Sequence, residues 1–346
     1  MRILEINTQK GWRGGENQTL LGLIGFKKLG HEVELLCMEG SALHVQAKNA
    51  GFICHTITSN SKSIGFLIKY GKNFPIIHTQ TSKQLTYCIL TKAFHKSKIV
   101  LSRRVDFVPK GFFTLLKYNA CDGIICVSSA IEKILKEAGV KTKTIVISDC
   151  VTEKVLDKSR AHELLSEINS TGKIIIGTTA ALVQHKDPVT LVNAINILRK
   201  MRQDFVLLHF GNGPLEQTVQ QLIESYKLQA HYKLMGFVER VEDYFSIFNY
   251  FVMSSEEEGL GSSVLDAFVY KVPVISTNAG GLTELVTGRG YVTEKKNPQL
   301  FAEALYRAMN DIIENKKFVQ VAYAYALTNL SIEKIHEAHI KFFKSI

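Results

Sequence analysis

Short apolar runs typical of strands alternate with helical stretches along nearly the whole chain, and this alternation starts twice. In the first half, apolar runs at 2–7 and 31–38 flank a stretch with helical periodicity at 17–29. After a polar stretch at 149–173, the alternation restarts with an apolar run at 174–178. Such alternation predicts parallel sheets with helices on both faces. We therefore expect an α/β fold of two doubly wound domains facing each other across a cleft, where such sheets bind ligands.

The same pattern suggests the domain boundaries. The chain has 346 residues, of which 46% are hydrophobic, so it can form two separate cores. We expect an N-terminal domain at 1–155, a linker at 156–172 and a C-terminal domain at 173–325. A final helix at 326–346 is expected to pack back on the N-terminal domain.

Apolar patterning and cysteine usage favour a cytoplasmic protein. No apolar run approaches the length of about 18 residues that a membrane-spanning helix needs. The first apolar run becomes polar too early for a secretory signal. The six cysteines form no Cys-x-x-Cys pair, which favours reduced core thiols over a disulfide or a zinc site.

The excess of positive charge lies in the first half of the chain. Residues 1–170 hold 24 Lys and Arg against 14 Asp and Glu, whereas residues 171–346 hold 18 of each kind. The segment 62–117 contains 11 basic residues, one acidic residue (Asp106) and several interleaved phenylalanines. Such a segment suits an anionic membrane surface or single-stranded nucleic acid, and a solvated lysine-rich face over core phenylalanines is equally compatible. We expect no nucleic acid, and a membrane role would place the protein at the inner membrane face.

The segment 254–266 contains the most informative motif. A loop with Gly259 and Gly261 follows an apolar run, and a helix is expected to begin near Ser263. Glycines let the backbone approach a ligand closely. A helix start offers free N–H groups and a positive dipole end to an anion such as a diphosphate.

Two carboxylates flank this loop, Glu258 before it and Asp266 in the expected helix. They can accept hydrogen bonds from sugar hydroxyls, so the segment is the pattern expected for a nucleotide-sugar. Two structural interpretations stay open from spacing alone. The run from Ser263 to Asp266 is close to a helix capping box, and residues 256–258 could form a solvated acidic turn.

The order of motifs resembles the Glu-x7-Glu region of the family-four retaining glycosyltransferases, also called glycosyl transferases group 1. The matching residues are Glu258-Gly-Leu-Gly261, Asp266, Val272-Pro-Val-Ile275 and Gly280-Gly-Leu-Thr-Glu284. These proteins have the GT-B fold of two Rossmann-like domains.

Four other segments resemble loops of the same family. Trp12-Arg-Gly-Gly-Glu-Asn-Gln18 resembles its Gly-Gly loop after the first strand. Leu182-Val-Gln-His-Lys-Asp187 resembles the loop whose lysine contacts the donor phosphates. Phe210-Gly-Asn-Gly-Pro214 and Met235-Gly-Phe-Val238 resemble segments on the nucleotide side of the site.

The resemblance implies a hexosyltransferase that uses a nucleoside-diphosphate sugar, retains anomeric configuration, and needs neither a metal nor a cofactor. The implied acceptor is a glycan or a lipid-linked molecule, in cell-envelope polysaccharide or lipopolysaccharide synthesis. The implied catalytic residues are Glu258 and Lys186. The implied donor-binding residues are Gly15, Gly213, Phe237, Val238, Leu260, Gly261, Ser262 and Asp266. The candidates for the acceptor side are Arg13, His78, Arg103 and Arg104.

The sequence departs from the family pattern in three places, one of which is Ser148-Asp-Cys-Val-Thr152, where the family usually has Pro-Asn-Gly-Val-Asp. Ala181 stands where the family often has an arginine, so Lys186 faces the diphosphate alone unless Arg13 contributes. Asp266 is one methylene shorter than the usual glutamate. His78, at the end of an expected strand, is more often a structural residue than a catalytic one.

Two alternative functions stay open. A nucleotide-sugar epimerase or hydrolase on the same fold would use the same donor site. A nucleic-acid-binding module would use the basic segment and leave the loop from Glu258 to Asp266 unexplained.

Overall fold

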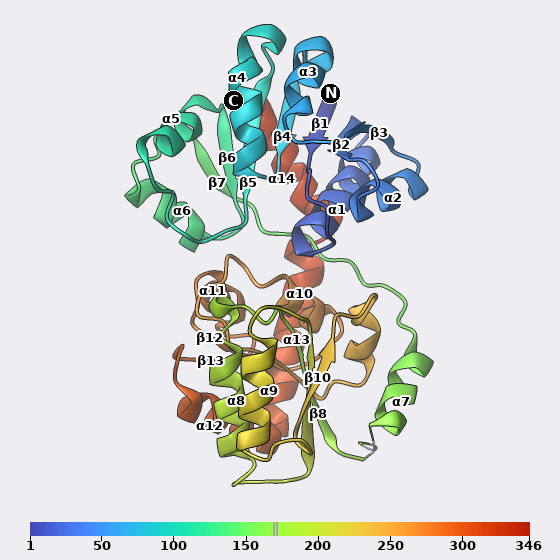
Figure 1. Cartoon of the computed structure of the whole chain (residues 1–346), viewed down its shortest axis with the longest axis vertical. Coiled ribbons are helices and arrows are strands. Elements are labelled where there is room, and N and C mark those ends of the chain that lie inside the picture. Colours follow the sequence, from blue (N-terminus) through green and yellow to red (C-terminus); the bar gives the residue numbers. More distant parts are fainter. Residues whose placement is uncertain (169, 171) are drawn as a thin grey trace. The chain divides into compact units, whose positions relative to one another are not determined.

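The computed structural model describes residues 1–168, 170 and 172–346, which form two compact units (Figure 1). Unit 1 contains Met1–Cys150 together with Asn329–Ile346, and unit 2 contains Val151–Thr328. Each unit is an α/β domain built on its own parallel sheet. Two doubly wound domains are therefore present, as the alternation of strands and helices predicted.

Unit 1 is built on a seven-stranded sheet with the order β3-β2-β1-β4-β5-β6-β7, and every pair is parallel. Its strands are β1 (Arg2–Ile6), β2 (Glu32–Met38), β3 (Ile53–Ile57), β4 (Ile76–Thr79), β5 (Lys98–Arg103), β6 (Gly123–Cys126) and β7 (Thr144–Val146). Its helices are α1 (Gly14–Lys28), α2 (Ala42–Asn49), α3 (Lys62–Tyr70), the 3-10 turn η1 (Gly71–Asn73), α4 (Ser82–His95), α5 (Phe112–Ala120), α6 (Ser129–Glu137) and α14 (Ile332–Lys344). The central strands are apolar and buried because helices cover both faces.

The C-terminal helix α14 is part of unit 1, where it packs against α1. In Figure 1 the red α14 lies among the blue and teal elements of this unit. The ring of Phe26 on α1 contacts the ring of His336 on α14 edge to face, with 4.9 Å between centroids. Gly25 is required at this crossing, because a Cβ there would lie 2.2 Å from Nδ1 of His336.

Unit 2 is built on a six-stranded parallel sheet with the order β10-β9-β8-β11-β12-β13. Its strands are β8 (Ile174–Thr179), β9 (Phe205–Phe210), β10 (Tyr232–Gly236), β11 (Tyr250–Met253), β12 (Val274–Thr277) and β13 (Tyr291–Thr293). Its helices are α7 (Lys158–Glu167), η2 (Gln184–Lys186), α8 (Pro188–Leu198), α9 (Glu216–Ser225), η3 (Val241–Ser246), α10 (Ser262–Val269), α11 (Gly281–Val286) and α12 (Pro298–Asn310). The helix α13 (Ile312–Asn329) runs to the unit boundary. Buried Val, Leu, Ile and Phe from α8, β9 and α12 form the main core.

The boundary between the units differs from the expected linker at 156–172. Unit 2 already begins at Val151, and most of the expected linker is the helix α7. Asp157 caps α7, and its backbone N–H donates to Oδ1 of Asp243 in η3 at 2.9 Å. Polar contacts of this kind attach the segment to unit 2. Its lack of strand character had suggested a linker instead. Residues 169 and 171 of the expected linker lie outside the described residues.

Among the described residues, no helix combines the length and the apolar character required to cross a bilayer.

Candidate functional site

The candidate site lies at the topological switch point of the unit 2 sheet. The strands β8 and β11 are neighbours there, with Tyr250 beside Ile176 and Phe251 beside Gly177. On one side of this pair the sheet continues from β8 to β9 and β10, and on the other side it continues from β11 to β12 and β13. The loops after β8 and β11 therefore leave the same sheet edge side by side, which is where open α/β sheets bind ligands.

The loop after β11 is fastened to the loop after β8 by hydrogen bonds to the main chain. Ser254 Oγ donates to the carbonyl oxygens of Lys186 at 3.1 Å and Asp187 at 3.0 Å. The backbone N–H of Glu256 donates to the carbonyl oxygen of His185 at 2.9 Å. These bonds fix both loops relative to each other before any ligand arrives.

Lys186 and Glu258 meet across these two loops. The Lys186 ammonium donates to Oε2 of Glu258, and Ser255 Oγ donates to the same oxygen at 3.3 Å. The two side chains are 20% and 12% exposed, so solvent and solutes still reach them. An anion arriving here could compete with Glu258 for the lysine and leave the carboxylate free to accept hydrogen bonds.

The start of α10 lies at the same sheet edge. Ser263 Oγ donates to the carbonyl oxygen of Thr179, the last residue of β8, at 3.2 Å. Gly261 precedes the helix with φ of 97°, in the region that favours glycine, and a Cβ there would lie 2.5 Å from Leu282. The helix start therefore directs its positive dipole end to the same sheet edge at which the loop of Lys186 leaves β8. Leu260 is buried, and Ser262 is the first residue of α10.

Asp266 lies within α10 and is half-buried. Burial raises the pKa of its carboxyl group to about 7; the nearby Lys154 lowers it and Glu242 raises it further. Lys154 and Glu242 are themselves paired at 2.8 Å. Asp266 is therefore held in an environment that disfavours its ionised form, unlike Glu258 beside a cation.

Gly213 belongs to a third loop, after β9, which packs tightly on the loop after β8. A Cβ on Gly213 would lie 2.4 Å from the carbonyl oxygen of Leu182, and one on Gly211 would lie 2.1 Å from that of Ala180. These glycines let the backbones of the two loops touch. Phe237 and Val238 follow β10, which is separated from β8 by β9; Phe237 is exposed and Val238 is half-buried.

In unit 1, Gly15 and Arg13 lie at the start of α1, after β1. Arg13 is exposed, and its backbone N–H donates to Oε2 of Glu16 at 3.0 Å. A Cβ on Gly15 would meet no atom within 4 Å, so packing within unit 1 does not require glycine there.

His78 and Arg104 line a small pocket inside unit 1. His78 is 2% exposed and bonds through Nδ1 to Glu5 Oε1 at 2.6 Å and through Nε2 to Ser102 Oγ at 2.8 Å. Arg104 donates to Asp149 Oδ1 at 2.9 Å and is half-buried. His78 is therefore buried, and both of its ring nitrogens have a hydrogen-bond partner.

Arg103, a candidate for the acceptor side from sequence, makes its contacts within unit 1. It is buried, and its guanidinium donates to the hydroxyl of Tyr118 at 2.6 Å and to the carbonyl oxygen of Phe107. The side chain is directed inward, where it holds the loop after β5. Neighbouring Arg104 leaves the strand on another side, as its contacts with Asp149 show.

Sequence reasoning missed the residues that support the site. Ser254 and Ser255 bind the facing loop and Glu258, and Asp187 caps α8 by accepting from the N–H of Thr190 at 3.1 Å. The Asp187-Pro188 pair is a helix-start signal that could have located this cap. Across the described part of the chain, no cluster of three or more His, Cys, Asp or Glu side chains is arranged to hold a metal ion.

Comparison with known proteins relates the chain to glycosyltransferases. The family model of glycosyl transferases group 1 matches residues 163–325. An uncharacterized glycosyltransferase of Methanocaldococcus jannaschii is 26% identical over 236 residues, which cover 65% of this chain and 62% of that protein. The chain spans between 39% and 62% of the length of the first three curated relatives that it matches.

Two solved structures share the fold over essentially the whole chain. Anabaena HepE, crystallised with UDP and with UDP-glucose, has a TM-score of 0.86 at 16% identity and full coverage of both chains. A glycosyltransferase from Rickettsia africae has a TM-score of 0.84 at 20% identity, covering 99% of this chain and 98% of that one. The segment 163–325 is therefore similar to the glycosyl transferases group 1 family, and the two α/β units have the GT-B fold.

Proposed function

We propose that this protein is a retaining glycosyltransferase that moves a hexosyl group from a nucleoside diphosphate to a hydroxyl of a glycan or lipid-linked acceptor. The observation that carries the proposal is the meeting of Lys186, Glu258 and the start of α10 at the switch point of unit 2. A cation and a helix start suit a diphosphate, and a carboxylate beside them suits sugar hydroxyls. UDP and UDP-glucose bound to Anabaena HepE support this class of donor.

The reaction requires that the negative charge of the leaving diphosphate be stabilised while the glycosidic bond breaks. Lys186 and the N–H groups at the start of α10 supply this positive charge, so we invoke no metal ion. Glu258, released from Lys186 by the phosphates, orients the donor sugar. Asp266 holds the ribose hydroxyls.

Retention follows if the acceptor hydroxyl attacks from the face that the diphosphate leaves. The hydroxyl oxygen forms the new bond to the anomeric carbon, and a departing phosphate oxygen takes its proton. Unit 1 then binds the acceptor, with Arg13 as the exposed cation at the start of α1. We place the reaction in the cytoplasm, in the synthesis of cell-envelope polysaccharide or lipopolysaccharide. All six cysteines are free thiols, as a reducing compartment allows.

The experiment is a rate assay of nucleoside diphosphate release from UDP-, GDP-, ADP- and dTDP-sugars. Glu258→Gln should lower kcat by about 100-fold or more while the affinity for the nucleoside diphosphate stays, because the carboxylate acts on the sugar. Glu303→Gln, an exposed position on α12, is the matched control and should behave as the wild type. Undiminished turnover by Glu258→Gln would remove this residue from the mechanism. Release of free or isomerised sugar without any acceptor would instead assign a hydrolase or an epimerase.

A further inference from the structure

Large apolar side chains are exposed on the loop after β5 and the helix α5 in unit 1. Phe112 and Phe113 at the start of α5 are 74% and 82% exposed, and Leu116 one turn later is 55% exposed. Phe107 and Val108 in the preceding loop are 60% and 53% exposed. We call these five residues the α5 patch. Soluble proteins rarely leave so many neighbouring apolar side chains in water unless they bind something.

The α5 patch stands on a well-fastened support. The buried Arg103 bonds to Tyr118 on α5 and to the carbonyl oxygen of Phe107, and its guanidinium lies 5.6 Å from the Phe107 ring. The loop and the helix are therefore tied to one buried side chain. The α5 patch is therefore exposed on a part of the surface that these contacts hold in place.

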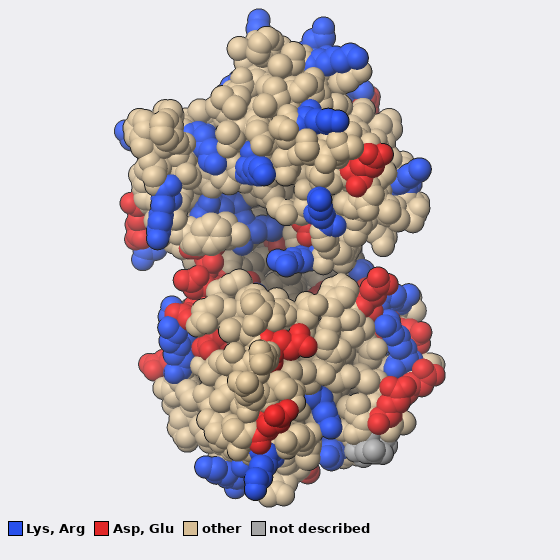
Figure 2. All heavy atoms as spheres, in the orientation of Figure 1, with Lys and Arg blue, Asp and Glu red and all other residues tan. Residues whose placement is uncertain are grey.

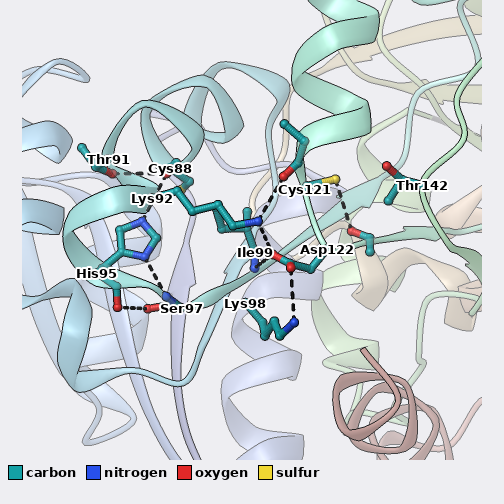
Figure 3. A network of polar contacts seen from close by, with 12 residues as sticks. Cys88, Thr91, Lys92, His95, Ser97, Lys98, Ile99, Cys121, Asp122 and Thr142 are labelled. Atoms are coloured by element: carbon teal, nitrogen blue, oxygen red, sulfur yellow. Dashed lines mark hydrogen bonds and ion pairs between the residues drawn. The ribbon is translucent and has the colours of Figure 1, made fainter.

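Lysines of α4 and α5 fix the helix along its length. Lys117 on α5 donates to the carbonyl oxygen of Ser82 on α4 at 3.1 Å. In Figure 3, Lys92 on α4 reaches the carboxylate of Asp122 at 2.8 Å, and it also donates to the carbonyl oxygen of Ala120, the last residue of α5, at 3.1 Å. The helix thus presents its apolar side chains without being able to turn them inward.

The surroundings of the patch are basic. Unit 1 holds 24 Lys and Arg against 12 Asp and Glu, whereas unit 2 holds 18 against 20. Figure 2 shows blue side chains over unit 1 with few red ones on the same face. Lys110 lies between the two parts of the patch and is exposed, and so is Lys83 on α4. The partner must therefore offer both an apolar interior and negative charge.

We propose that the α5 patch docks on an anionic lipid bilayer, with its phenylalanines among the acyl chains and Lys110 and Lys83 at the headgroup phosphates. This combination of aromatic wedges and lysines is what the bilayer interface accommodates. A second copy of the chain would bring like charges together, so it fits less well. Nucleic acid would stack on the rings but leave the aliphatic Val108 and Leu116 without a partner. The inference goes beyond the proposed function, because it does not depend on the donor site.

The test is sedimentation of the full chain with lipid vesicles. The protein should bind vesicles of phosphatidylcholine with about 30% phosphatidylglycerol at least tenfold more tightly than phosphatidylcholine alone. Replacing the two rings, Phe112→Ser with Phe113→Ser, should weaken binding to the anionic vesicles by about tenfold or more. Lys110→Glu should weaken it by a smaller factor that shrinks at high salt.

Unit 2 provides a matched control. Ile312 and Ile313 at the start of α13 are 64% and 84% exposed, so Ile312→Ser with Ile313→Ser removes comparable exposed apolar surface and should leave vesicle binding unchanged. Circular dichroism verifies that both double variants are folded.

Three results would overturn the proposal. They are equal binding to neutral and anionic vesicles, vesicle binding that survives the two phenylalanine substitutions, and a dimer seen by light scattering that those substitutions dissociate. Binding of a single-stranded oligonucleotide that requires Phe112 and Phe113, without vesicle binding, would assign the patch to nucleic acid. Titration with nucleotide-sugars in the absence of vesicles keeps the two proposals separate, since the phenylalanine variant should bind the donor as the wild type does.

Discussion

Glu258 and Asp266 come from one loop and helix but lie in opposite electrostatic environments. Glu258 is paired with Lys186 and accepts from Ser255, so its negative charge is compensated. Asp266 is half-buried, and desolvation raises the pKa of its carboxyl group to about 7. A residue that costs folding free energy at neutral pH is more readily explained by binding than by stability.

The pH dependence of Asp266→Asn tests this view. The folded pKa of Asp266, about 7, exceeds its ordinary value of 3.8, so native Asp266 destabilises the fold progressively as pH rises between these values. Asp266→Asn should therefore raise the melting temperature at about pH 8, with the gain disappearing near pH 4. It should also weaken nucleotide-sugar binding. Asp204→Asn, an exposed residue paired with Arg202, is the control and should give no such gain. A lower melting temperature for Asp266→Asn at pH 8 would contradict the environment described.

Sequence alone could not resolve the neighbours Arg103 and Arg104. They are adjacent in a basic run, yet Arg103 is buried against Tyr118 whereas Arg104 bonds to Asp149, 45 residues later in the chain. The direction of each arginine side chain depends on the residues that pack against it in the fold. The local sequence pattern does not identify those residues. His78 was ambiguous for the same reason, because its partners Glu5 and Ser102 come from two other strands.

At the scale of elements, glycines determine how closely the loops of unit 2 pack. Gly281 opens α11, and its N–H donates to the carbonyl oxygen of Glu258 at 2.9 Å. A Cβ on Gly281 would lie 2.3 Å from the carbonyl oxygen of Gly259. The backbone of Gly259 cannot move aside as a flexible side chain would. Glycine at position 281 therefore allows the Glu258 loop to pack directly on the start of α11.

Gly281→Ala should therefore displace the Glu258 loop, although Gly281 is not itself one of the proposed donor-binding residues. We expect a loss of about 1–3 kcal/mol in the free energy of unfolding and a weaker affinity for nucleotide-sugars, measured by denaturant titration and calorimetry. Gly65→Ala is the control, since Gly65 lies in α3 with no atom within 4 Å of the added Cβ. There the helix should gain about 0.5–1 kcal/mol. Unchanged donor affinity in Gly281→Ala would show that the loop does not depend on this contact.

The alternation of strands and helices predicted both parallel sheets and the loops at their edges. It could not predict that Lys186 would meet Glu258, 72 residues later, because that contact depends on the pairing of β8 with β11. The family resemblance implied only that both residues serve the donor site. The attachment of the expected linker to unit 2 could not be predicted, because the partners of its helix α7 lie in η3, far along the chain.

At the scale of the whole molecule, the chain returns to unit 1 after completing unit 2. Phe343 on α14 is buried, with its ring 5.8 Å from Phe26 and 5.4 Å from His78. The last residues of the chain therefore complete the core of its first domain. The units also differ in charge, with the excess of basic residues confined to unit 1.

Phe343→Ala should destabilise unit 1 by about 3–5 kcal/mol and leave unit 2 protected, as measured by hydrogen exchange. Phe301→Ala, in the buried core of unit 2, is the reciprocal variant and should reduce protection only there. Equal loss of protection in both units from either substitution would show that they unfold as one body.

The central claim is that the switch point of unit 2 binds the diphosphate of a nucleotide-sugar through Lys186. Its most direct test is calorimetric titration of the wild type, Lys186→Ala and Lys316→Ala with the nucleoside diphosphate of the preferred donor. Lys316 is exposed on α13 and serves as the matched lysine. We expect Lys186→Ala to bind the nucleoside diphosphate at least about tenfold more weakly, whereas Lys316→Ala should bind it as the wild type does. Equal affinity in all three proteins would contradict it.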